Sequence, residues 1–172
     1  MNEFQTINVN LSNLSEEERE QLLKLVERSN TPAKKRWRGK KNDDYYLITS
    51  DGKVADVIET ESAPDNDYYQ FGNYFKTEEE AEFELNKRFV YQELKDYALE
   101  HNEMGIDWTD DRIKWSIYYD TETKCLTCDY WYTNYCGMEQ VYFSSAEIAQ
   151  GAISAIGEDR IKKYLFGQMI FI

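Results

Sequence analysis

Short runs rich in aromatic and β-branched residues, bounded by turn residues, predict two β-hairpins. Residues 45–49 and 54–58 flank the sequence Ser-Asp-Gly-Lys, and Asp-Gly is typical of a tight hairpin turn. Residues 113–119 and 125–132 flank a second polar turn over residues 120–123. Because so few residues separate the two runs of each pair, we expect the neighbours to pair antiparallel.

Each hairpin is followed by another extended stretch that leads toward a helix. After the first hairpin, residues 60–67 are predicted to form an acidic loop and residues 68–75 an extended stretch. After the second hairpin, residues 140–143 are predicted to form a further strand. The pattern therefore indicates two units in which strands precede a helix.

Both stretches end in the same strand-to-helix junction. Residues 74–81 and 142–149 each begin with Tyr-Phe, continue with a hydroxyl residue and carry a glutamate in the first helical turn. Thr77 and Ser144 are the predicted helix caps, because each is followed three residues later by a glutamate, as in a capping box. No reactive side chain accompanies either copy, so we interpret the junction as scaffold rather than as a duplicated active unit.

Apolar residues at helical spacing predict four helices. The first begins after Ser12 or Ser15, of which Ser15 has the capping box with a glutamate three residues later, and it ends near residues 29–30. The longest covers residues 77–101, and two more cover residues 146–156 and 159–165. An extended arm over residues 4–10 precedes the first helix.

These elements predict an α+β fold, with antiparallel sheets built from two hairpin-plus-helix units and preceded by an N-terminal helix. We divide the chain into a strand and helix arm over residues 1–33, a basic linker over residues 34–43 and an α+β domain over residues 44–172. The apolar stripe of the first helix allows two arrangements. It either packs on the domain or forms a homodimer with a second copy.

Charge is distributed unevenly along the chain. The net charge is −13, yet residues 34–41 carry six positive charges and no negative one, so the rest of the chain carries −19. Such a body repels nucleic acid and favours partners with a basic surface. The densest acid lies on the longest predicted helix, and the candidate partner-binding residues there are Glu78, Glu79, Glu82, Glu84, Glu93, Asp96 and Glu100.

The basic segment has two interpretations. Cations interleaved with an aromatic ring are typical of nucleic-acid binding, with phosphate contacts and a base stacked on the ring. Alternatively, the segment is a solvated linker that lies against the acidic helix of the same protein. The candidate nucleic-acid residues are Lys34, Lys35, Arg36, Trp37, Arg38, Lys40 and Lys41.

Catalytic and metal-binding patterns are weak in this chain. Cys125 and Cys128 have the spacing of half a zinc site, but residues three apart in a strand point to opposite faces, so buried structural cysteines are the favoured interpretation. Aspartate pairs are common among 33 acidic residues, and none is joined to a second histidine. We therefore expect no catalytic residue, no metal and no cofactor, with a metal-dependent enzyme that uses scattered aspartates as the last alternative.

The three cysteines, the absence of a secretory signal and the lack of a run of about 20 apolar residues predict a cytoplasmic protein without a membrane partner.

Four stretches, residues 14–27, 71–81, 142–145 and 156–167, resemble a group of small accessory proteins encoded by phages and prophages of Gram-positive bacteria. The resemblance implies a viral setting in a bacterial host and supplies no catalytic residues. Together with the charge, it favours a non-enzymatic protein that binds a host protein through an acidic, aromatic-rich surface, as a counter-defence inhibitor similar to anti-CRISPR proteins. Nucleic-acid binding through residues 34–41 is the alternative.

Overall fold

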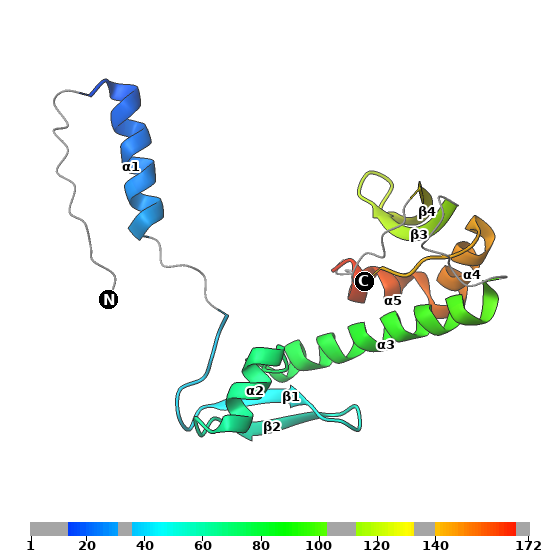
Figure 1. Cartoon of the computed structure of the whole chain (residues 1–172), viewed down its shortest axis with the longest axis horizontal. Coiled ribbons are helices and arrows are strands. Elements are labelled where there is room, and N and C mark those ends of the chain that lie inside the picture. Colours follow the sequence, from blue (N-terminus) through cyan, green and yellow to red (C-terminus); the bar gives the residue numbers. More distant parts are fainter. Residues whose placement is uncertain (1–13, 31–35, 103–112, 133–139, 168–172) are drawn as a thin grey trace. The chain divides into compact units, whose positions relative to one another are not determined.

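The computed structural model describes residues 14–30, 36–102, 113–132 and 140–167 (Figure 1). The chain divides into two compact units, residues 1–36 and residues 37–172, and each is described by itself. The described part is an α+β structure with five helices and two small antiparallel sheets of two strands each, as the sequence predicts.

The first unit contains the helix α1, Glu16–Asn30. Its predicted capping box is confirmed. The Ser15 hydroxyl accepts a hydrogen bond from the Glu18 backbone N–H at 3.3 Å, and the Glu18 carboxylate accepts one from the Ser15 N–H at 2.8 Å. Leu23 and Leu25 on this helix are 59% and 60% exposed, so the described part of the unit does not bury these two leucines. The predicted arm over residues 4–10 lies outside the described residues.

The second unit begins with the predicted hairpin. Strand β1, Asp44–Ile48, pairs antiparallel with β2, Val54–Ile58. Tyr45 and Leu47 of β1 are buried, and they form a small core with Tyr74. Because side chains alternate along a strand, the residues between them face the other side of the hairpin.

The segment after β2 differs from the prediction. The expected acidic loop over residues 60–67 and extended stretch over residues 68–75 are wrong, because helix α2, Ala63–Phe71, occupies most of the first and half of the second. Ser62 caps this helix through a capping box with Asp65, and a proline stands in the first turn, where no intrahelical N–H is needed. Gly72 ends it with a left-handed φ of 78°.

The two Tyr-Phe junctions take the same structure. Phe75 exchanges two backbone hydrogen bonds with Tyr46 of β1, both of 2.9 Å. Phe143 exchanges two with Trp115 of β3, at 2.9 and 2.8 Å. The strand expected over residues 140–143 is therefore a single antiparallel bridge. Each junction attaches its helix to the first strand of the preceding hairpin.

The helices that follow the two junctions are both capped by hydroxyl side chains. Thr77 caps α3, Glu78–His101, by accepting a hydrogen bond from the Glu80 N–H, as predicted. For α4, Ala146–Ile156, the predicted cap Ser144 is wrong, and Ser145 accepts the bond from Ile148 instead. A tertiary contact fixes Ser144 outside the helix, since its backbone N–H donates a hydrogen bond of 2.9 Å to the side-chain oxygen of Asn102.

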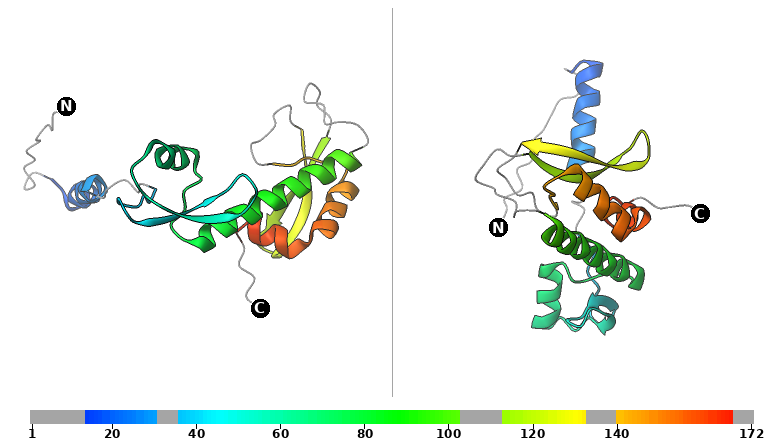
Figure 2. Two further views of the ribbon diagram at one scale, coloured as in Figure 1. Left: turned by 90° about the horizontal axis from the view of Figure 1, so that it is seen from below. Right: turned by 90° about the vertical axis from the view of Figure 1, so that its right-hand side faces the viewer.

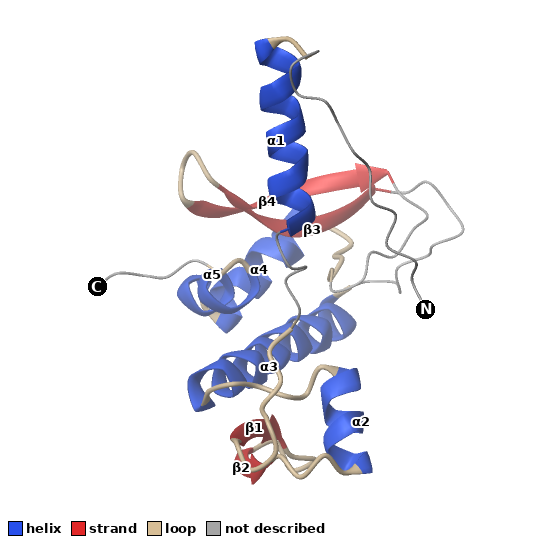
Figure 3. Cartoon of the chain, turned by 90° about the vertical axis from the view of Figure 1, so that its left-hand side faces the viewer, coloured by secondary structure: helices blue, strands red, loops and turns tan. Residues whose placement is uncertain are grey.

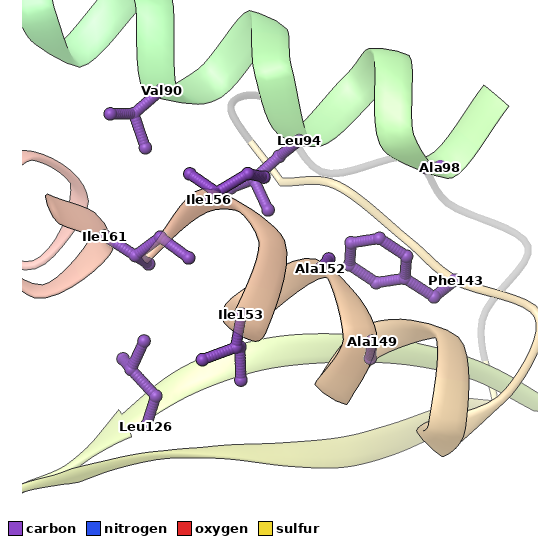
Figure 4. Packing of buried hydrophobic residues seen from close by; sticks show 10 residues of the cluster. All are labelled: Val90, Leu94, Ala98, Leu126, Phe143, Ala149, Ala152, Ile153, Ile156 and Ile161. Carbon is purple, nitrogen blue, oxygen red and sulfur yellow. The ribbon is translucent and has the colours of Figure 1, made fainter. Parts of the chain in front are cut away.

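The main core lies between three helices and the second hairpin. This hairpin pairs β3, Ile113–Asp120, with β4, Cys125–Tyr132, and α5, Glu158–Leu165, follows α4 after Gly157. The views in Figures 2 and 3 place α3 between the β1–β2 hairpin and the group of β3, β4, α4 and α5. The buried residues of this core, drawn in Figure 4, are Val90, Leu94, Ala98, Leu126, Phe143, Ala149, Ala152, Ile153, Ile156 and Ile161.

Candidate functional site

Helix α3 separates its charges by face. Five of its seven predicted partner-binding acids are spaced by four, eleven, three and four residues, close to whole turns of a helix with 3.6 residues per turn. They therefore share one side, here called the acidic face, which consists of Glu78, Glu82, Glu93, Asp96 and Glu100. The basic residues of α3 lie on the other side of the helix, at Lys87, Arg88 and Lys95.

The acidic face is exposed at both of its ends. Glu78, Glu82, Asp96 and Glu100 are all exposed. Glu93 is half-buried, and its carboxylate accepts two hydrogen bonds of 2.8 and 2.9 Å from the Arg160 guanidinium of α5. Glu93 is thus a structural contact between two helices, and the four exposed carboxylates are the part that a partner can reach.

The exposed acids of this face fall into two pairs along the helix. Phe89 lies on the same side of α3 between the pairs, and a Cβ added to Gly52 would be 3.6 Å from its ring, so the β1–β2 turn lies close to this part of the helix. From Glu82 to Asp96 the helix rises about 21 Å, and from Glu78 to Glu100 about 33 Å. The exposed acid therefore presents two clusters of two carboxylates along one straight element.

Glu79 and Glu84 do not belong to this face. Glu79 is exposed one residue beyond Glu78, a step that turns it about 100° away. Glu84 lies on the side of the basic residues, where it accepts a hydrogen bond of 3.3 Å from Arg88.

The basic segment is partly built into the second unit. Of its charged residues, Lys34 and Lys35 lie outside the described residues, and Arg36, Lys40 and Lys41 are exposed. Trp37 is half-buried against the small core, with its ring 5.7 Å from that of Tyr74. The Arg38 side chain points inward to an ion pair with Glu59. Arg38 therefore contacts the end of the first hairpin and not the acidic helix.

Glu59 is the centre of a closed polar cluster. Its carboxylate is fully buried and accepts hydrogen bonds from Arg38 at 3.1 and 3.3 Å, from the Tyr74 hydroxyl at 2.8 Å and from the Glu61 N–H at 2.7 Å. Burial raises the pKa of Glu59, but the bonds from Arg38 and Tyr74 outweigh it, and its pKa is held below its ordinary value. Burial and the hydrogen bond to Glu59 raise the pKa of Tyr74 to about 12. The Arg38 guanidinium also donates a hydrogen bond of 2.7 Å to the side-chain oxygen of Asn66.

A second buried carboxylate, Asp65, lies beside the cluster. Its two oxygens accept hydrogen bonds from the Tyr45 hydroxyl at 2.9 Å and from the backbone and hydroxyl groups of Thr60 and Ser62 at 2.7 to 3.0 Å. Burial opposes ionisation, but these donors lower the pKa of Asp65 far below its ordinary value. Burial and the bond to Asp65 raise the pKa of Tyr45.

All four oxygens of the two carboxylates accept hydrogen bonds from donors of the same chain, so the cluster holds the Arg38 segment and α2 on the first hairpin. Proton transfer to a substrate would require an open side on one of these acids, and both are closed. Sequence reasoning missed Glu59 and Asp65 as structural centres. The Ser-Ala-Pro-Asp capping pattern was the available signal for Asp65, whereas nothing local marks Glu59 as a partner of Arg38.

The two described cysteines lie apart. The prediction of buried cysteines is wrong for Cys125, which is exposed at the start of β4. Cys128 is partly buried against the main core opposite Ile117, and burial raises its pKa. Among the described residues, no three His, Cys, Asp or Glu side chains come together as metal ligands.

Within the part of the chain that the structure describes, no helix is both long and apolar enough to cross a membrane. Compared with known protein families, curated proteins and solved structures, the chain matches none of them.

Proposed function

We propose that this protein is a non-enzymatic binding protein that engages a partner protein with a basic surface through the acidic face of α3. The observation that carries the proposal is the separation of charge around this helix. Four exposed carboxylates lie on one side, and the helix places no lysine or arginine among them. An acidic surface of this kind attracts and orients a basic partner.

An apolar group beside the acidic face favours a specific contact. Leu99 is 83% exposed and lies three residues after Asp96, so it neighbours that acid at the edge of the acidic face. Interfaces combine apolar contact with a polar rim, so this end of α3 has both components. The N-terminal pair, about 33 Å away at its far end, would add a second electrostatic contact.

The biological setting of the proposal is viral. In this interpretation the protein acts in the cytoplasm of a bacterial host as a phage accessory protein, and its partner is a host nuclease or another component of defence. Supporting it are the net charge of −13 and the resemblance of four stretches of the sequence to phage accessory proteins.

A quantitative pull-down from lysate of a Gram-positive bacterium tests the proposal. The bait variant replaces Glu78, Glu82, Asp96 and Glu100 by glutamine or asparagine. The matched control makes the same charge change at exposed acids elsewhere, at Asp56, Asp67, Glu122 and Asp159. The wild type and the control are expected to retain one basic protein that the bait variant loses, because only the bait variant lacks the acidic face.

The captured protein is then purified and titrated directly at two salt concentrations. Binding should weaken as salt rises, since exposed charges are screened over about 10 Å at 0.1 M. Equal capture by the bait variant and the wild type, or binding indifferent to salt, would contradict the proposal.

A further inference from the structure

The opposite side of α3 borders a pocket of about 540 Å³. Its apolar lining comes from α3, β3, α5 and the segment around the Phe143 bridge, and its most buried members are Leu94, Phe143 and Ile161, each no more than 3% exposed. Figure 4 shows these three side chains between α3, α4 and α5. Pockets of small ligands have volumes of roughly 300 to 1,000 Å³ and mostly apolar walls, so this one has the size and lining of a ligand site.

The polar groups of the pocket are mainly hydrogen-bond donors. Lys87, Arg88 and Tyr91 come from α3, and Gln140 comes from the segment before the Phe143 bridge. The Gln140 side-chain oxygen accepts a bond from the Tyr142 hydroxyl at 3.0 Å, and the same amide carries two N–H donors. Glu84 is the one acid in the lining, and it is engaged by Arg88.

This charge balance is the reverse of that of the whole protein. Two cations and one carboxylate line the pocket, whereas the chain as a whole carries −13. An anion is therefore repelled less at this lining than over most of the acidic surface, and the adjoining apolar cavity can take the rest of the molecule.

We propose that this pocket binds a small amphipathic carboxylate, with its apolar body among Leu94, Ile117 and Ile161 and its carboxylate beside Lys87 and Arg88. The site lies away from the acidic face, and its occupancy does not depend on the protein partner proposed above. A failed pull-down therefore leaves this proposal standing, and the reverse also holds.

Titration of the full chain with octanoate and with octanol, followed by amide chemical shifts in NMR spectra, tests the proposal. Octanoate is expected to shift the amides of Tyr91, Ile117 and Val141, and to bind roughly fivefold or more tightly than octanol, because only octanoate carries the charge that Lys87 and Arg88 attract. Equal affinities, or shifts confined to other regions, would overturn it.

Variants of opposite sign separate the charge effect from damage to the fold. Lys87→Gln should weaken octanoate binding by up to roughly fivefold and leave octanol unchanged, whereas Glu84→Gln should strengthen octanoate binding, because it removes the opposing charge. Lys124→Gln, which makes the same charge change at an exposed residue of the β3–β4 turn, is the control and should have no effect. If Glu84→Gln weakens binding as Lys87→Gln does, the proposal is wrong.

A truncated variant that ends at Gly167 tests whether the protein's own C-terminal residues compete with octanoate for the pocket. Residues 168–172 include the apolar sequence Met-Ile-Phe-Ile directly after the pocket residues Leu165 and Phe166. Octanoate binding that appears only in the shortened chain would assign the pocket to the protein's own C-terminal residues and would overturn the proposal.

Discussion

The bond between Tyr45 and Asp65 offers a sharp test of how the first hairpin is held. Tyr45 is fully buried, and its hydroxyl donates to one oxygen of a carboxylate that is 4% exposed. Tyr45→Phe removes the hydroxyl but keeps the ring, which stacks on that of Tyr74 with centroids 3.9 Å apart. A hydrogen bond to a charged group contributes about 1.5 to 3 kcal/mol, and the second Asp65 oxygen keeps its four donors, so we expect a loss of about 2 kcal/mol.

Urea unfolding followed by tryptophan fluorescence measures this loss as a change in the midpoint at constant slope. The control is Tyr46→Phe in the next position of β1, which removes a hydroxyl for which no hydrogen bond is present among the described residues. Its effect should stay within about 0.5 kcal/mol. If Tyr45→Phe costs no more than this control, the buried carboxylate does not depend on the phenol and the reasoning about the cluster fails.

Three further predictions address pH, capping and packing. The depressed pKa of Asp65 contributes stability that is present above the pKa of this group in the unfolded chain, near 4, and is lost as pH falls further. The urea midpoint should therefore drop steadily below pH 4. A flat profile between pH 5 and pH 3 would refute this. Ser145→Ala should cost about 1 kcal/mol in thermal unfolding and Ser144→Ala close to nothing, whereas the opposite order would restore the cap predicted from the sequence. Gly151→Ala places a Cβ against the Tyr97 hydroxyl and should therefore destabilise the wild type. In a Tyr97→Phe background the same substitution should stabilise by up to about 1 kcal/mol, which is the gain of alanine over glycine in a helix. Equal effects in both backgrounds would argue against the contact.

Local patterns in the sequence were sufficient for most of the secondary structure. Both hairpins and the helices α1, α3, α4 and α5 follow from turn residues, capping boxes and apolar spacing, because these signals act over a few neighbouring residues. The exception, α2, was also marked locally by Ser62 and Asp65. The aromatic and acidic composition of that stretch favoured an extended interpretation instead.

The candidate site was only partly readable from the chain. Helical spacing alone places Glu78, Glu82, Asp96 and Glu100 on one side of α3. It could not exclude Glu93, since its partner Arg160 is 67 residues away in the sequence. Nor could it show that Glu84 borders the pocket.

The same limit applies to the basic segment. The sequence of this segment does not indicate which of its side chains are solvated and which are buried. Arg38 is paired because the fold brings it to Glu59, which is 21 residues away in the chain.

Propensity, capping and periodicity are properties of short stretches, so the linear chain is enough to set which segments are helices and strands and where charge is dense. Which of those charges are available to a partner depends on the fold. Burial and pairing depend on residues far apart in the chain, and through them Arg38, Glu93 and Asp65 became structural contacts while four carboxylates of α3 stayed exposed.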